Sequence, residues 1–126
     1  MSKYSKMWEA ARMPTLDDLR QGKRIAVKWK VRLNIWPWWD DRKVVLQSAG
    51  YNIDSRGEWG FWRMSWDSIK RYMVLNYDHP NNSKFARRIV DHIRILPDGT
   101  IIGRFYLRVF GRLWFLSWFT MERSES

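Results

Sequence analysis

Residues 24–36 read RIAVKWKVRLNIW, and this stretch decides the predicted fold. Every odd-numbered position from Ile25 to Ile35 is apolar, whereas the even positions 28 to 34 carry two lysines, an arginine and an asparagine. Strict period-two alternation is typical of a β-strand with one buried face and one solvated face. One-sided burial is more typical of antiparallel than of parallel sheets. The stretch therefore predicts a long antiparallel strand whose outer face is basic.

Six further strand-like runs follow this strand and are joined by short turns. They span Lys43–Ala49, Glu58–Trp66, Ile69–Tyr77, Arg87–Leu96, Thr100–Val109 and Leu113–Arg123. Consecutive strands that share one amphipathic face tend to close on themselves, because closure removes the exposed edges. We therefore expect an all-β fold, a single antiparallel β-barrel of seven to eight strands in meander order.

One short helix is predicted before the first strand. Thr15 suits the N-cap, and the two acids that follow Leu16 suit the first turn. Such a short helix is not stable alone, so Leu16 and Leu19 are expected to pack near one end of the barrel. Residues 1–13 form a basic lead-in. Its few apolar side chains would allow a helical turn that packs on the barrel, so both possibilities are kept for this segment. The expected organisation is this lead-in followed by one barrel domain, residues 14–126.

Composition narrows the class of protein. A chain of 126 residues fits one domain, and 17% aromatic residues predict a core rich in rings. The absence of cysteine excludes disulfides and zinc-thiolate sites, and it is compatible with a reducing compartment.

The N-terminal residues lack the apolar block of a secretory signal, and no run approaches the roughly 20 apolar residues that span a bilayer. We expect a cytoplasmic protein. Its formal net charge of +10 favours anionic partners.

The sequence around Gly99 fixes the register of one hairpin. Leu96-Pro97-Asp98-Gly99-Thr100 suits a three-residue loop with Gly99 in the left-handed conformation. Pairing then places Ile95 opposite Ile101 and Asp91 opposite Phe105, so that Asp91 lies on the apolar face. A two-residue loop would mix apolar and basic residues on each face, so the first register is preferred.

Asp91 is the sharpest indication of an interior site. A carboxylate on an apolar face must be paired, hydrogen-bonded, hydrated or protonated, because an isolated buried charge is too costly. As a functional residue, Asp91 would anchor the polar end of a ligand. As a structural residue, it would pair with an arginine such as Arg63 or lie near a hydrated rim.

No catalytic or metal-binding residue is predicted. His79 and His92 each follow an aspartate, but adjacent residues of a strand point to opposite faces, so Asp91 and His92 cannot readily act together. His79 precedes a turn sequence, and the two histidines show no metal-ligand spacing. No cofactor is expected, and an enzyme acting on a hydrophobic substrate is kept as a further alternative.

Three tryptophans surround Pro37, which cannot donate a ladder hydrogen bond and so ends the first strand. Trp36, Trp38 and Trp39 are then expected at the mouth of the barrel. Their rings could plug the open end, line a ligand portal or anchor at a lipid interface. The final strand is apolar on both faces and so needs an outer cover as well.

The basic outer faces allow a different kind of partner. Lys28, Lys30 and Arg32 form one stripe, and a second stripe consists of Arg88, Arg94, Arg104 and Arg108 with Tyr106 among them. Cations that flank aromatic platforms suit single-stranded nucleic acid. The alternative to a ligand-binding barrel is therefore an interaction module for nucleic acid or an anionic membrane.

The layout of a short helix, a long amphipathic strand and a meander resembles the lipocalin and fatty-acid-binding superfamily of small barrels. IVDHIRILPDGTIIGRFYLR, residues 89–108, and LWFLSWFTMER, residues 113–123, are similar to the closing part of bacterial lipocalin-like domains of the GXWXG kind. The resemblance implies a closed barrel with a hydrophobic interior, and binding rather than catalysis.

The preferred hypothesis is therefore non-catalytic binding of a small hydrophobic or amphipathic molecule, such as a fatty acid or related lipid. Asp91 or Arg63 would meet its polar end, and the oligomeric state is left open. The side chains expected to line the interior are Val27, Trp29, Val31, Leu33, Phe105 and Leu107.

Overall fold

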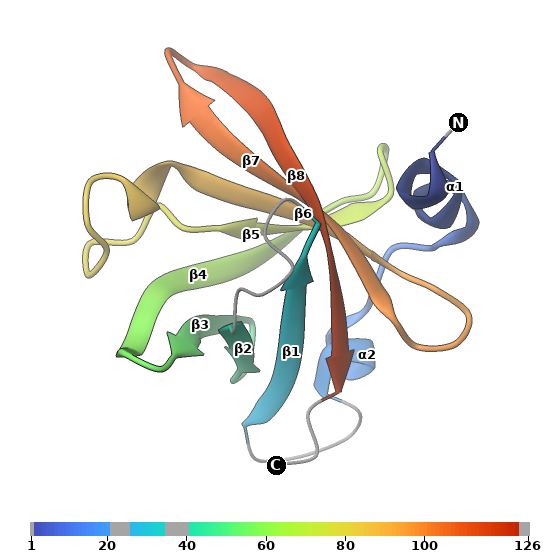
Figure 1. The fold of residues 1–126 in the computed structure, drawn as a ribbon, viewed down its shortest axis with the longest axis horizontal. Helices are drawn as coiled ribbons and strands as arrows, with labels where there is room; N and C mark the ends of the chain where they lie inside the picture. Colours follow the sequence, from blue (N-terminus) through green and yellow to red (C-terminus); the bar gives the residue numbers. More distant parts are fainter. Residues whose placement is uncertain (1, 21–25, 35–40, 124–126) are drawn as a thin grey trace.

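The computed structural model describes residues 2–20, 26–34 and 41–123. Within these residues, eight antiparallel strands each pair with the next, and β8 also pairs with β1 to close a barrel (Figure 1). The expected all-β fold, a single antiparallel barrel in meander order, is confirmed. The strands are β1 Val27–Leu33, β2 Asp41–Val45, β3 Ala49–Asp54, β4 Gly57–Asp67, β5 Tyr72–Asn76, β6 Ile89–Ile95, β7 Ile101–Val109 and β8 Arg112–Arg123.

Strand β1 follows the alternation of its sequence. Val27, Trp29 and Val31 are buried, while the lysines between them are exposed. Period two places successive side chains on opposite faces, so a closed barrel receives the odd positions inside and leaves the cations in water. This is the predicted orientation of the first strand.

Strand β3 was not predicted. The expected run from Lys43 to Ala49 instead contains the end of β2, a turn at 46–48 and the start of β3. Glycine, asparagine and aspartate give β3 a low intrinsic strand propensity, and pairing with β2 and β4 on both sides overrides it. The expected start of the run Ile69–Tyr77 is also wrong, because Ile69 lies in the β4–β5 turn and is 91% exposed, and β5 starts at Tyr72.

The β6–β7 hairpin has the predicted register. Ile95 pairs with Ile101, Ile93 with Gly103, and Asp91 with Phe105. Gly99 has a φ of +90°, in the left-handed region. Turn chemistry and facial segregation of apolar residues therefore sufficed to align these two strands.

Two bulges change which residues face inward. Asn52 pairs with Trp59 and Gly50 with Trp62, so β4 carries one extra residue near Gly60, whose φ is +60°. A bulge of this kind shifts the alternation by one position and sharpens the bend of the strand. In β8 the extra residue is Leu116, between the partners of Phe105 and Tyr106.

Two short helices precede the barrel, one more than was predicted. Helix α1, Lys3–Ala10, forms in the N-terminal segment, for which a docked helical turn was one of two possibilities. The Ser2 hydroxyl caps it by accepting a hydrogen bond from Ser5 N at 3.1 Å. The indole of Trp8 on this helix is buried against the guanidinium groups of Arg94 and Arg104.

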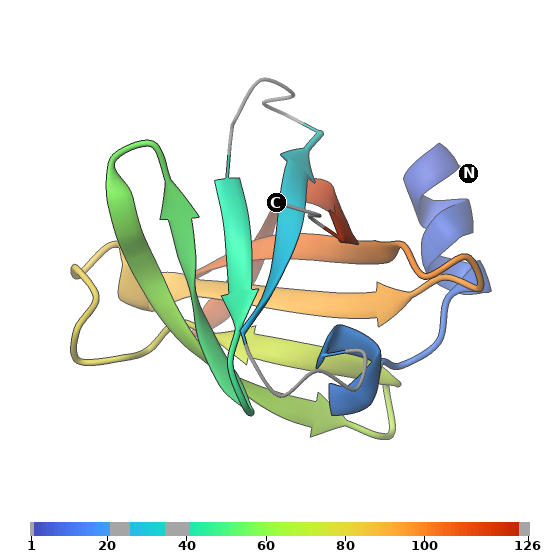
Figure 2. The same ribbon diagram turned by 90° about the horizontal axis from the view of Figure 1, so that it is seen from below.

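The predicted helix is α2 Leu16–Arg20, and its cap is the expected one, since Asp18 N donates to Thr15 Oγ1 at 3.1 Å. It lies near the start of β1 (Figure 2). Leu19 is 1% exposed in the core cluster, and its carbonyl accepts a hydrogen bond from Trp29 Nε1 at 2.9 Å. Helix α2 therefore covers this end of the core. Neither helix has the length and apolar character required to cross a bilayer, and the same holds for every helical segment of the described residues.

Candidate functional site: a cavity with a buried polar cluster

A cavity of about 420 Å³ occupies the part of the barrel interior toward the end where β1 finishes. Three exposed side chains, Arg56, Phe85 and Leu116, mark its mouth. Most of its lining is aliphatic or aromatic. The described residues that line it are Val31, Leu33, Asp41, Lys43, Asn52, Arg56, Trp59, Tyr77, Phe85, Ile89, Asp91, Phe105, Leu116, Ser117 and Phe119.

The rest of the interior is filled by side chains. Trp29 is 0% exposed, and Met73, Ile93 and Met121 are buried around it together with Leu19. An eight-stranded barrel is wide enough either to be packed solid or to hold one small ligand. Within the described residues this barrel does both, because the half covered by α2 is packed and the opposite half contains the cavity.

Four polar side chains meet in the wall of the cavity, and we call them the polar cluster: Lys43, Asn52, Tyr77 and Asp91. The Lys43 ammonium lies 3.2 Å from Asp91 Oδ2 and donates to Asn52 Oδ1 at 3.0 Å. It also donates a hydrogen bond to Tyr77 Oη. The Tyr77 hydroxyl in turn donates to Asp91 Oδ2 at 3.0 Å. All four side chains are buried.

Asn52 ties the cluster to the barrel wall. Its Nδ2 donates to Tyr77 Oη at 3.1 Å, and its Oδ1 accepts from Trp62 Nε1 at 3.1 Å. The cluster comes from four parts of the chain: β2, β3, the residue that follows β5, and β6. Fully satisfied networks of this kind hold their members in a single arrangement. A ligand entering the cavity would therefore meet a preformed group of donors and acceptors.

The polar cluster carries no net charge. Burial raises the pKa of Asp91, and the neighbouring Lys43 ammonium and the Tyr77 hydroxyl act against that rise. Burial, with the Asp91 charge adding to it, holds the pKa of Tyr77 well above its usual value, so Tyr77 stays a neutral phenol. One cation and one carboxylate in contact leave no net charge on the cluster.

The predicted lining residues divide into two groups. Val31, Leu33, Asp91 and Phe105 line the cavity. Val27 and Trp29 face inward as predicted but belong to the packed half, and Leu107 packs against the core cluster outside the cavity lining. Trp36, Trp38 and Trp39, predicted at the mouth, lie outside the described residues.

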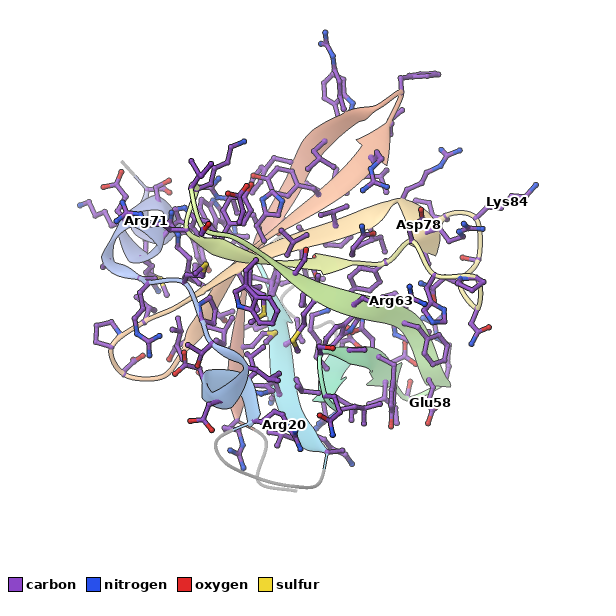
Figure 3. All side chains as sticks on the ribbon, turned by 180° about the vertical axis from the view of Figure 1, so that it is seen from behind. Arg20, Glu58, Arg63, Arg71, Asp78 and Lys84 are labelled. Carbon is purple, nitrogen blue, oxygen red and sulfur yellow. The ribbon has the colours of Figure 1, made fainter. Side chains whose placement is uncertain are left out.

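Arg63, predicted to pair with Asp91 or to meet the ligand, lies outside the described lining of the cavity, and Asp91 pairs with Lys43. The Arg63 side chain is exposed on β4, between the buried Trp62 and Met64 (Figure 3). The bulge near Gly60 is the physical reason, because it turns both Trp59 and Trp62 inward and moves Arg63 to the outer face. The cation beside Asp91 is Lys43 instead.

Lys43, Asn52 and Tyr77 were missed from the sequence. Lys43 pairs with the inward-facing Trp29 across β1 and β2, so its inward position could have been inferred had that register been known. Asn52 lies in the strand that was not predicted. The only available signal was the need of a buried Asp91 for a cation, and sequence alone does not say which cation.

The two histidines lie apart from the cavity. The His92 ring stacks on Tyr72 with centroids 4.0 Å apart and contacts Tyr106. Burial, with repulsion from Arg104, lowers the pKa of His92 to about 4. His79 lies in the β5–β6 connection, where its Nδ1 accepts from Asn81 N at 3.1 Å. In the described ranges, no group of three or more histidine, aspartate or glutamate side chains is arranged to hold a metal ion.

The basic stripes differ in accessibility. The lysines of β1 are exposed. In the second stripe, Arg94 donates to the carbonyls of Trp8, Lys70 and Arg71, and Arg104 stacks on Trp8 with 4.1 Å between the guanidinium carbon and the ring centroid. Helix α1 therefore engages the middle of the stripe that was considered for nucleic acid.

Comparisons of the chain with protein-family models, with curated proteins and with solved structures found no match.

Proposed function

We propose that this protein binds a small apolar or amphipathic molecule inside its barrel, without catalysis. The single observation that carries the proposal is the half-hollow interior, a largely apolar cavity with one buried polar cluster in its wall. Its volume of about 420 Å³ falls in the range of roughly 300–1,000 Å³ that is usual for ligand sites. Apolar walls with a few fixed polar groups are the general design of such sites.

The closed eight-stranded antiparallel barrel is compatible with the calycin-like fold that the sequence resembles. A lipocalin-like binding role is therefore part of the proposal. In this arrangement Leu33, Phe105 and Phe119 contact the apolar body of the ligand, and the polar cluster receives its polar end.

The charge balance of the cavity narrows the ligand class. Lys43 is already neutralised by Asp91 within the polar cluster. Arg56, the other cation among the described lining residues, is exposed at the mouth and paired with Asp54, so a ligand carboxylate at the buried polar cluster would meet no unpaired positive charge there and would lose its hydration. We propose an uncharged polar end, such as the oxygen of a fatty alcohol, ester or amide, in preference to an ionised fatty acid.

Displacement of the uncharged fluorophore aminoanthracene tests both parts of this proposal. We expect decanol to displace the probe at least about tenfold more effectively than decanoate at pH 8, a difference of roughly 1.4 kcal/mol. The preference should shrink when decanoate is protonated near pH 4. Equal displacement by both at pH 8 would contradict an uncharged polar end.

A blocking variant locates the binding site. Leu33→Trp introduces an indole at the cavity wall and should abolish probe binding. Leu46→Trp is the matched control, because Leu46 is 42% exposed and lies outside the cavity lining. Native mass spectrometry of both variants with decanol gives an independent count of bound ligand. If wild type takes up neither probe nor decanol, or if Leu33→Trp binds as wild type does, the proposal is wrong.

A further inference from the structure

The β7–β8 hairpin extends away from the barrel body (Figure 1). It also presents large apolar side chains to solvent. Phe110 at its tip is 100% exposed, Trp114 is 55% exposed and Phe115 is 48% exposed. Soluble proteins seldom display contiguous aromatic side chains without a binding role. The hairpin therefore has the character of a contact surface.

The charge of the hairpin is one-sided. Residues 101–119 contain three arginines and no acidic residue, and Arg112 beside the tip is exposed. A second copy of the hairpin would bring like charges together, so self-association at the tip is disfavoured. An anionic surface complements Arg108 and Arg112 beside the tip. Of the two anionic partners that the sequence suggests, nucleic acid and an anionic membrane, only the membrane also offers an apolar phase for Phe110 and the indole of Trp114.

The hairpin tip and the cavity mouth lie at the same end of the barrel. Strands alternate in direction around a meander, so the β3–β4, β5–β6 and β7–β8 connections share one end, as Figure 1 shows. Arg56 and Phe85 of the mouth belong to the first two of these connections. Leu116 connects the two features directly, because it is both an exposed residue of the hairpin and a wall of the cavity.

We infer that the β7–β8 hairpin inserts its aromatic tip into the surface of an anionic lipid bilayer and so places the cavity mouth at the membrane. Docking itself stands on the hairpin alone, whereas direct exchange of ligand between bilayer and cavity also rests on the proposed function. Aromatic side chains enter the interface between headgroups and acyl chains, while arginines contact anionic headgroups.

Vesicle sedimentation tests the docking step. The probes are phosphatidylcholine vesicles with and without one quarter phosphatidylglycerol, at low and high salt. Wild type should bind the anionic vesicles preferentially. The double variant Phe110→Ser/Trp114→Ser should lower the partition coefficient at least tenfold. The matched control is Leu46→Ser/Ile69→Ser, which removes two exposed apolar side chains from turns at the other end and should bind as wild type does.

Three results would overturn the inference. The first is an absence of wild-type binding to anionic vesicles, and the second is a tip variant that binds them normally. The third is a wild-type dimer in light scattering that Phe110→Ser/Trp114→Ser converts to a monomer, since the occupant would then be a second copy. Tight binding of a single-stranded oligonucleotide with no binding to vesicles counts as the first result and would favour the nucleic-acid alternative. Circular dichroism melts check that the variants fold.

The two proposals fail separately. Leu33→Trp should keep vesicle binding and lose aminoanthracene, whereas Phe110→Ser/Trp114→Ser should keep aminoanthracene binding in solution. Transfer of aminoanthracene from anionic vesicles should be at least tenfold slower for the tip variant than for wild type. Equal transfer rates would contradict exchange at the docked mouth even if docking itself is observed.

Discussion

Replacement of Lys43 by methionine should destabilise the protein strongly, because it leaves the Asp91 carboxylate buried without its cation. The two side chains are 5% and 4% exposed, and Nζ lies 3.2 Å from Oδ2. With an effective dielectric constant of about 20, the Coulomb attraction at that distance is about 5 kcal/mol. Measured losses on removing one partner of a buried pair are about 3–5 kcal/mol. We expect a decrease in the free energy of unfolding within that range at pH 7.

Urea denaturation with a full set of controls measures this loss. Lys30→Met is the matched control, since Lys30 lies on the exposed face of β1, and it should change stability by less than about 0.5 kcal/mol. The double variant Lys43→Met/Asp91→Leu removes both charges. Its free energy of unfolding should be at least about 2 kcal/mol higher than that of Lys43→Met, because no unpaired charge remains buried.

The dependence on pH provides a further check. Burial already raises the pKa of Asp91, and loss of Lys43 should raise it more. A carboxyl whose folded pKa exceeds its unfolded value favours the folded state at low pH and loses that contribution as pH rises through the folded pKa. The loss in free energy of unfolding caused by Lys43→Met should therefore become smaller as the pH is lowered toward 5. A loss below about 1 kcal/mol at pH 7, or a double variant no more stable than the single one, would refute the reasoning.

Two further predictions concern other parts of the fold. Because the pKa of His92 is lowered to about 4, the unfolded chain binds a proton that the folded one does not between about pH 6.5 and pH 4, so stability should fall as pH falls through that window. His92→Phe should flatten this decline in thermal melts, and an unchanged slope would show that another group causes it. At Gly50 an added Cβ would lie 2.2 Å from the Val44 carbonyl oxygen and 2.5 Å from the Trp62 ring. Gly50→Ala should therefore cost about 1–3 kcal/mol in urea denaturation, and a wild-type midpoint would contradict that close approach.

Local patterns of the sequence determined much of the barrel wall. The alternation of residues 24–36 predicted the inner and outer faces of β1, and the turn at Gly99 predicted the β6–β7 pairing residue by residue. Both signals depend on neighbours a few positions apart, so they can be read without knowing the fold. For the same reason, Asp91 could be assigned to the inner face before its partner was known.

Only the tertiary structure decided what Asp91 meets and where the interior is hollow. Lys43 and Tyr77 reach Asp91 because closure of the barrel brings β2, the residue after β5, and β6 around one cavity. A bulge near Gly60 moves Arg63 to the outer face. The division between packed and hollow halves depends on Trp29 filling the end beneath α2. Such contacts join residues far apart in the chain, and a one-residue bulge, which no period predicts, reverses every side chain beyond it.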